Sequence, residues 1–236
     1  MERFYGSSVN GTVEFRQLIA DNLRADDYVL DLGCGGGREE IDFRRDCAYV
    51  AGCDRSDSVA INPFVSAGVK GDAYSLPFKN EVFNAVLMDF VMEHLEFPDQ
   101  CAAEIARVLK PGGALFFRTP NFYHYVALVA RLTPHSFHRS VVRKLSGSQE
   151  TEAFETYYRL NTRRDVRNVL ARASLEAEEI RMVEKEPYYL TFAVPPFLLG
   201  AAYERLVNKF EGLAGIRSNI FGHFRKPLRN RAQANS

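Results

Sequence analysis

Residues 28–37 read YVLDLGCGGG, a short apolar run that ends in an acid and a cluster of glycines. Such a run followed by glycines is typical of a buried strand in a parallel sheet that ends in a tight turn. Glycines at 33, 35 and 37 let the backbone come close to a ligand. A dinucleotide fingerprint would need glycine at 38, where this chain has Arg, and Asp31 would repel a phosphate. The stretch therefore predicts a ligand-binding turn that favours a cationic amino-acid moiety over a pyrophosphate.

Helix and strand patterns alternate on both sides of this turn. Up to residue 120 the hydrophobic spacing predicts helices over 13–24, 38–46 and 98–109, and strands over 28–33, 48–54, near Val69, 82–89 and 114–120. Further along it predicts helices over 162–173 and 196–210, an edge strand over 175–184 and a final strand over 219–227. This alternation implies βαβ units, and therefore an α/β fold with a doubly wound, mostly parallel sheet.

Length and composition fit one globular domain over residues 1–236. Of the 236 residues, 46% are apolar and 25% charged, which excludes a disordered or collagen-like chain. The four cysteines form no CxxC pair and residues 1–25 hold no apolar signal core, so we expect free thiols and a cytoplasmic location. The formal net charge is zero, so no overall field attracts nucleic acid. The sequence leaves the oligomeric state open.

The charges are unevenly distributed along the chain. Residues 105–149 hold seven basic and no acidic residues. The alternation of elements stops after Pro120, and residues 121–160 are rich in aromatic side chains and His, so we expect an inserted substrate lid over the ligand-binding edge. Arg139 and Arg143 lie within it and would attract a phosphorylated or carboxylated acceptor. The alternative is that these arginines are merely solvated.

Four acids stand at the ends of four successive predicted strands. They are Asp31, Asp54, Asp72 and Asp89. In an open parallel sheet, ligands bind at the carboxyl ends of the strands, so these carboxylates are expected to converge on one crevice. Asp54 lies 21 residues after the first glycine of the turn, the reach of an acid that binds ribose hydroxyls. The alternative is that each aspartate caps the helix that follows.

Five segments, in this order, resemble the motifs of class I S-adenosylmethionine-dependent methyltransferases of the type 11-like group. They are VLDLGCGGG (29–37), GCD (52–54), GDAYSLPF (71–78), FNAVLMDFVMEHL (83–95) and RVLKPGG (107–113). The resemblance implies a seven-stranded Rossmann-like sheet with one antiparallel strand, and S-adenosylmethionine as the cofactor. More faintly, LTPHSFH (132–138) and YYRLNT (157–162) resemble methyltransferases encoded among bacterial glycan and envelope biosynthesis genes.

The resemblance also implies roles for individual residues. The methionine part of the cofactor would be lined by Asp31, Gly33, Cys34 and Gly35, with Asp89 and Phe90 beside its amino group. Asp54 would bind the ribose hydroxyls, and Asp72 with the Ala73 backbone would recognise the adenine edge. Arg55 would pack beside the adenine, although the family often has an apolar residue there.

Methyl transfer to a hydroxyl also requires that a proton be removed, which a general base accelerates. His94, five residues beyond Asp89, is the first candidate, and His124 is the second. Either histidine could instead only order its loop. Tyr123, Tyr157 and Tyr158 could shape the acceptor pocket or belong to the core or lid packing. No third ligand accompanies His135 and His138, so we expect no metal.

We therefore predict methyl transfer to an oxygen, or a nitrogen, of a small-molecule or saccharide acceptor. The alternative is a catalytically silent cofactor-binding subunit that supports a partner protein. A nucleic-acid substrate is disfavoured because the Asn/Asp-Pro-Pro-Tyr type of motif is absent after the fourth strand. Residues 187–203 carry no charge, which indicates core or dimer packing or, alternatively, contact with a membrane surface.

Overall fold

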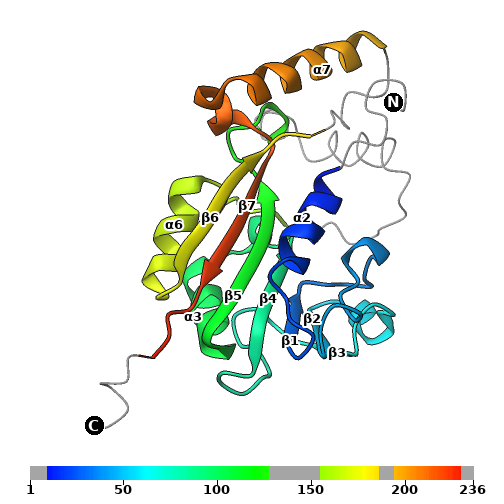
Figure 1. Cartoon of the computed structure of the whole chain (residues 1–236), viewed down its shortest axis with the longest axis vertical. Coiled ribbons are helices and arrows are strands. Elements are labelled where there is room, and N and C mark those ends of the chain that lie inside the picture. The colour runs from blue at the N-terminus through cyan, green and yellow to red at the C-terminus, as the bar shows by residue number, and fades with distance from the viewer. Residues whose placement is uncertain (1–9, 128–154, 186–193, 230–236) are drawn as a thin grey trace.

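The computed structural model describes residues 10–127, 155–185 and 194–229. Within them, seven strands form one sheet in the order β3-β2-β1-β4-β5-β7-β6 (Figure 1). Their bounds are Tyr28–Leu32 (β1), Tyr49–Asp54 (β2), Ala67–Lys70 (β3), Phe83–Asp89 (β4), Leu109–Pro120 (β5), Glu176–Val183 (β6) and Asn219–Arg225 (β7). Only β7 is antiparallel, to both β5 and β6. The predicted doubly wound, mostly parallel fold with one antiparallel strand is therefore confirmed.

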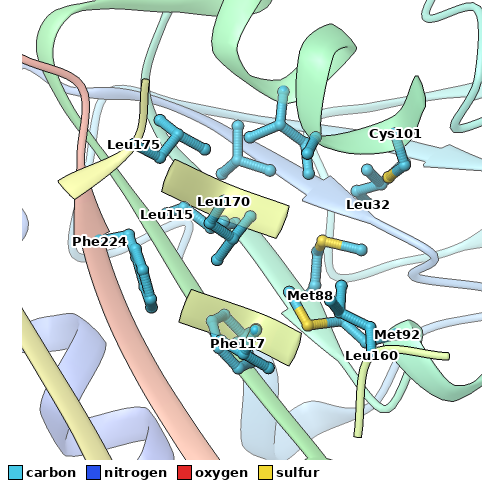
Figure 2. Close-up of a cluster of buried hydrophobic side chains, with 14 of the residues drawn as sticks. Leu32, Met88, Met92, Cys101, Leu115, Phe117, Leu160, Leu170, Leu175 and Phe224 are labelled. Atoms are coloured by element: carbon cyan, nitrogen blue, oxygen red, sulfur yellow. The ribbon is translucent and has the colours of Figure 1, made fainter. Parts of the chain in front are cut away.

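Helices cover both faces of the sheet. The helix α2 (Gly11–Ala20) packs on one face, and α3 (Pro98–Val108) and α6 (Arg163–Arg172) pack on the other (Figure 1). Along β5, Leu115 and Phe117 belong to the core under α3 and α6, whereas Phe116 belongs to the core under α2. Figure 2 shows the first of these cores, in which Phe117 and Phe224 extend from adjacent strands. Burial on both faces is the reason that the strands read as continuous apolar runs rather than alternating ones.

Helix ends follow the capping chemistry of the sequence. The side chain of Asn10 accepts a hydrogen bond from the Val13 N–H and starts α2 earlier than predicted. Thr162 caps α6 by accepting from the Asp165 N–H, as its position predicts. The helix α7 (Val194–Lys209) extends beyond the end of the sheet at which β5 ends (Figure 1).

Two element predictions were wrong in extent. Residues 38–46 form only a short 3₁₀ turn, Glu39–Ile41, instead of a helix. The Asp42 carboxylate there accepts from both the backbone and the guanidinium of Arg44, a local arrangement that competes with a helix. The strand β5 begins at Leu109 rather than at residue 114, because Leu109 already pairs with Phe83 of β4. The register is irregular over KPGG, and regular pairing resumes at Ala114 opposite Ala85.

Most of the predicted insertion over 121–160 lies outside the described residues, which include only 121–127 and 155–160 of it. The single-domain organisation and the lid therefore stay predictions. Among the described helices, none has the length and apolar character needed to cross a membrane.

The close contact between β5 and β7 gives a test of the fold. A Cβ at Gly222 would lie 2.1 Å from Cζ of Phe117, whose ring is fully buried. Gly222→Ala should therefore reduce the free energy of unfolding by about 1–3 kcal/mol through overpacking, measured by urea denaturation. Gly212→Ala is the matched control, because nothing lies within 4 Å of a Cβ there. Equal stability of the two variants would contradict the described packing.

Candidate functional site

A pocket of about 360 Å³ lies at the carboxyl ends of the parallel strands. Its walls come from the residues that follow four strands: Gly33 after β1, Asp54 and Arg55 at the end of β2, Asp72 after β3, and Phe90 after β4. Its volume falls in the range of small-molecule sites in proteins. Of the four strand-end acids, Asp54 and Asp72 line this pocket, whereas Asp31 and Asp89 do not.

The turn after β1 is shaped by its glycines. Gly33 has φ +78°, and its N–H donates to the carbonyl of Cys53 at 2.7 Å. A Cβ at Gly33 would lie 2.3 Å from Cγ2 of Val91, which follows β4 and also lines the pocket. Both the backbone conformation and the space therefore require glycine at this position.

The same turn is held from β2 by Asp54. The Gly35 N–H donates to Asp54 Oδ2 at 2.7 Å, and the Ser56 N–H donates to Oδ1 at 2.8 Å. Asn62 adds a contact that the sequence reasoning missed, since its Nδ2 donates to the Gly35 carbonyl at 3.2 Å. A Cβ at Gly37 would lie 2.1 Å from Asn62 Oδ1. Nothing in the local pattern around Asn62 points to this role, because the contact joins residues 27 positions apart.

The two acids of the pocket retain acceptor capacity. Each carboxylate oxygen has two lone pairs, and each oxygen of Asp54 uses one of them for a backbone N–H. Asp72 accepts from the Tyr74 N–H at 3.0 Å through Oδ1, and its Oδ2 has no partner within the described part of the chain. Asp54 can thus accept from a pair of hydroxyls, and Asp72 from an amino group.

Asp31 and Cys34 lie behind the turn and not on the pocket wall. Burial raises the pKa of Asp31 to about 7, against the opposing charge of Arg38. Burial also raises the pKa of the Cys34 thiol to about 12, so this cysteine stays protonated. Their proposed contact with a ligand, like that of Gly35, stays a prediction.

Asp89 is held by arginines rather than exposed in the pocket. Its carboxylate accepts from both Arg118 and Arg38. The Arg118 guanidinium lies between the rings of Phe15 and Phe90, at 5.3 and 4.6 Å from their centroids. Burial lowers the pKa of Arg118 to about 10, so it stays charged at neutral pH. The sequence reasoning missed Arg118, although a charged residue inside the apolar run ALFFRTP was a signal.

Phe90 connects this ion pair to the pocket. It has φ +58°, an uncommon conformation for a side-chain-bearing residue. Its N–H donates to the Arg118 carbonyl at 3.0 Å, and its ring contacts the Arg118 guanidinium and lines the pocket. The strained backbone thus places an aromatic wall directly after β4.

His94 stands at the other end of the pocket together with Glu155 and Tyr157. Its Nδ1 lies 2.8 Å from the backbone carbonyl of Glu155. A carbonyl oxygen only accepts, so Nδ1 donates its proton and the neutral ring keeps a lone pair on Nε2. This is the tautomer that a general base of the pocket would need.

A buried polar chain supports the loop that carries His94. Asn161 Nδ2 donates to Thr119 Oγ1 at 2.7 Å, and Thr119 Oγ1 donates to Glu93 Oε2 at 3.0 Å. Burial raises the pKa of Glu93 to about 7. The Tyr157 N–H donates to the Glu93 carbonyl at 2.8 Å, so residues 155–161 are joined to the loop after β4 at two places.

The remaining candidate residues lie apart from the pocket wall. His124 is buried beside Glu184, with 3.5 Å between Nε2 and Oε2, and Tyr123 is 54% exposed. Tyr158 is joined to the Glu93 carbonyl by its N–H and does not line the pocket. Arg139 and Arg143 lie outside the described residues. Within the described residues, no group of three His, Cys, Asp or Glu side chains could hold a metal ion.

Comparisons with known proteins agree with this geometry. Residues 30–117 match the family model "Methyltransferase domain". The chain is 34% identical over 99 residues to the demethylmenaquinone methyltransferase of Streptomyces avermitilis, covering 40% of this chain and 42% of that protein. It is 31% identical over 133 residues to the ubiquinone biosynthesis O-methyltransferase of Nitrosococcus oceani, covering 48% and 56%. The matches thus span about half the length of these relatives.

A solved SAM-dependent methyltransferase from Methanosarcina mazei has the same fold. The TM-score is 0.58 at 18% identity, and the match covers 90% of this chain and 98% of that one. Identity this low supports the fold alone, so the activity has to be argued from the residues of the pocket.

The buried pair of Glu184 and His124 gives a test that is independent of any ligand. Burial raises the pKa of Glu184 to about 8 and lowers the pKa of His124 to about 4, so both side chains are neutral near pH 7. The folded state therefore binds the Glu184 proton more tightly than the unfolded state does, and the stability that this gives is lost as the pH rises through about 8. In the wild type, the free energy of unfolding should therefore decrease between about pH 6.5 and 8.5. In Glu184→Gln this decrease should be smaller by about 1–2 kcal/mol, measured by urea denaturation.

The control for this test is Glu176→Gln, which removes an exposed carboxylate at the start of β6. It should leave the pH dependence of the wild-type protein unchanged. A decrease of the same size in Glu184→Gln and in the wild type would show that Glu184 is already ionised at neutral pH.

Proposed function

Because residues 30–117 form a methyltransferase domain of the class I S-adenosylmethionine-dependent family, we propose that the protein transfers a methyl group from S-adenosylmethionine to a hydroxyl oxygen of a small molecule. The observation that carries this proposal is His94 at the pocket wall, with its Nδ1 proton donated to the Glu155 carbonyl. When bound, the cofactor supplies a methyl group that its sulfonium already activates. The protein has to orient the acceptor, exclude water and receive a proton.

The pocket fits the nucleoside part of the cofactor. Asp54 would accept from the ribose hydroxyls through its remaining lone pairs, while its backbone contacts keep both oxygens in place. Asp72 and the Ala73 backbone would recognise the adenine edge, and Arg55 would pack beside the ring. These four residues follow β2 and β3, whereas Phe90 and His94 follow β4. The strand β1 lies between the two groups in the sheet.

The methionine part would lie over the glycine turn, next to Gly33 and Phe90. Its cationic amino group suits a region with the buried carboxyl groups of Asp31 and Asp89 behind it. The charge of Asp89 is already balanced by Arg118 and Arg38, so in this proposal Asp31 is the carboxyl group that would favour the amino group. Cys34 and Gly35 would contribute through the backbone of the same turn.

His94 would accept the proton of the acceptor at Nε2. A phenol has a pKa of about 10 and water about 15.7, so the proton transfer is less uphill for a phenolic hydroxyl than for a water-like one. The ubiquinone biosynthesis O-methyltransferase among the relatives supports oxygen as the target, and both relatives' names support a small molecule. The nitrogen and saccharide alternatives have no comparable support. His124 has no part in the proposal, because it does not line the pocket.

Contact with a membrane surface is a separate part of the proposal. Residues 186–193 lie outside the described residues, but α7 exposes Leu199 by 72% and Leu206 by 50%, and Phe210 follows with 50%. These apolar side chains suit an interfacial position. The methyl transfer proposed above does not depend on it.

Removal of the ribose-binding carboxylate tests the cofactor assignment. Asp54→Ala should weaken the binding of S-adenosylmethionine by about 10- to 100-fold, because hydrogen bonds to a charged group are lost, and calorimetry would measure the dissociation constant. Asp57→Ala is the matched control, since Asp57 is largely exposed and forms its ion pair with Lys70. Equal affinities of the two variants would exclude the nucleoside position.

Removal of the imidazole tests the base. His94→Gln should lower kcat by about 10²–10⁴-fold, because the proton acceptor is lost, while the dissociation constant of S-adenosylmethionine stays the same. The assay is methyl transfer to a panel of phenols. A wild-type protein that binds the cofactor tightly but methylates no acceptor would favour the silent cofactor-binding subunit instead.

A further inference from the structure

The acceptor end of the pocket contains a carboxylate that the proposed reaction does not use. Glu155 lines the pocket together with His94 and Tyr157, and the apolar residues Val91 and Leu95 line the same pocket. His94 and Tyr157 were both predicted from the sequence as site residues, but Glu155 was not. It enters the pocket from a segment that follows β5 by more than thirty residues.

Two contacts fix the position of Glu155. Its backbone carbonyl accepts from His94 Nδ1 at 2.8 Å, and its side-chain Oε2 accepts from the Tyr157 hydroxyl at 3.0 Å. The hydrogen bond to the Glu155 carboxylate raises the pKa of Tyr157, so the phenol stays protonated and remains a donor. Arg159 then joins the same segment to the loop after β4 by donating to the Glu96 carbonyl at 2.6 Å. The backbone of Glu155 is thus held against His94, and its exposed carboxylate is held by Tyr157.

The charges of the pocket wall are arranged asymmetrically. Among the described residues, its acids are Asp54 and Asp72 at the nucleoside side and Glu155 at the acceptor side. Its arginine, Arg55, follows Asp54 directly and therefore belongs to the nucleoside side. Among the described residues that line the pocket beside His94, Glu155 is the charged one, and none is a lysine or arginine. Arg159 lies behind this wall, over the ring of Tyr157 at 5.6 Å, and donates to the Glu96 carbonyl rather than to Glu155.

We propose that Glu155 is a specificity residue, which selects acceptors whose substituent next to the reacting hydroxyl is neutral or cationic and rejects a carboxylate or phosphate at that place. The proposal rests on the hydroxyl methyl transfer proposed above. Two unit charges about 5 Å apart in a largely aqueous environment change an equilibrium by roughly 5-fold. The expectation differs from that of the basic segment 105–149, which predicts an anionic acceptor held by Arg139 and Arg143.

A matched series of three phenols separates these expectations. The probes are 2,3-dihydroxybenzylamine, 2,3-dihydroxybenzyl alcohol and 2,3-dihydroxybenzoate, which place a cation, a neutral group and an anion beside the same hydroxyl. For the wild type, we expect kcat/KM to fall in that order, by roughly 5-fold between neighbours. Glu155→Gln should reduce each ratio to near one, because the amide keeps a hydrogen-bonding oxygen for Tyr157 but carries no charge.

The control is Glu176→Gln, which removes one exposed charge on β6 and should leave the series unchanged. The affinity for S-adenosylmethionine should be the same in all three proteins. Binding of the three phenols to the protein loaded with S-adenosylhomocysteine, measured by calorimetry, gives the same comparison without turnover. An order of binding that follows charge without any methyl transfer would refute the proposed function and support the role of Glu155.

Several results would overturn the proposal. One is an order of kcat/KM for the three phenols that Glu155→Gln leaves unchanged, and another is a preference of the wild type for the benzoate. The third is failure of the neutral alcohol to bind the protein loaded with S-adenosylhomocysteine. Methyl transfer to all three phenols at equal rates would support the proposed function and refute the role of Glu155.

Discussion

The turn after β1 is the constraint on which the site depends. Its backbone is confined between Val91, which leaves no room for a Cβ at Gly33, and the Asp54 carboxylate, which accepts the Gly35 N–H. These two contacts join the ends of β1, β2 and β4, three neighbouring strands of the sheet. The geometry of the pocket therefore follows from the sheet, because a shift of any one strand would break the turn or move the acid.

The fold was predictable because its signals are local. The parallel strands β1, β2 and β4 are mostly apolar runs, since they are buried on both faces, and Thr162 marks the start of α6 by its capping chemistry alone. Residues 38–46 failed as a helix because a local Asp42–Arg44 arrangement competed with the helical hydrogen bonds. Asp54 and Asp72 were predictable for a related reason, as position at a strand end determines which edge a side chain reaches.

The rest of the site depends on contacts between distant residues, and these have no local signal. Asn62 donates a hydrogen bond to the glycine turn, 27 positions away in the sequence. Arg118 binds the Asp89 carboxylate, 29 positions away. The interpretation of Asp89 as a ligand contact neglected this competition. A buried guanidinium without a partner would be costly, so the strand that carries Arg118 requires an acid beside it. Asp89 satisfies that requirement from the adjacent strand, with Asp89 opposite Arg118 in the β4–β5 register.

The two ends of the pocket are consequently built in different ways. The nucleoside side follows strand ends, so its acids are placed by the register of the sheet and its chemistry is fixed with the fold. The acceptor side is closed by residues 155–161, which are joined to the loop after β4 at Glu93, His94 and Glu96. Asn161 joins the same segment to Thr119 of β5. The side chain of Glu155 can change without altering the sheet, because the contact of this residue with His94 is made by its backbone carbonyl. The carboxylate of Glu155 can therefore vary while the sheet stays the same. The identity of the acceptor should depend on the side chains of residues 155–161.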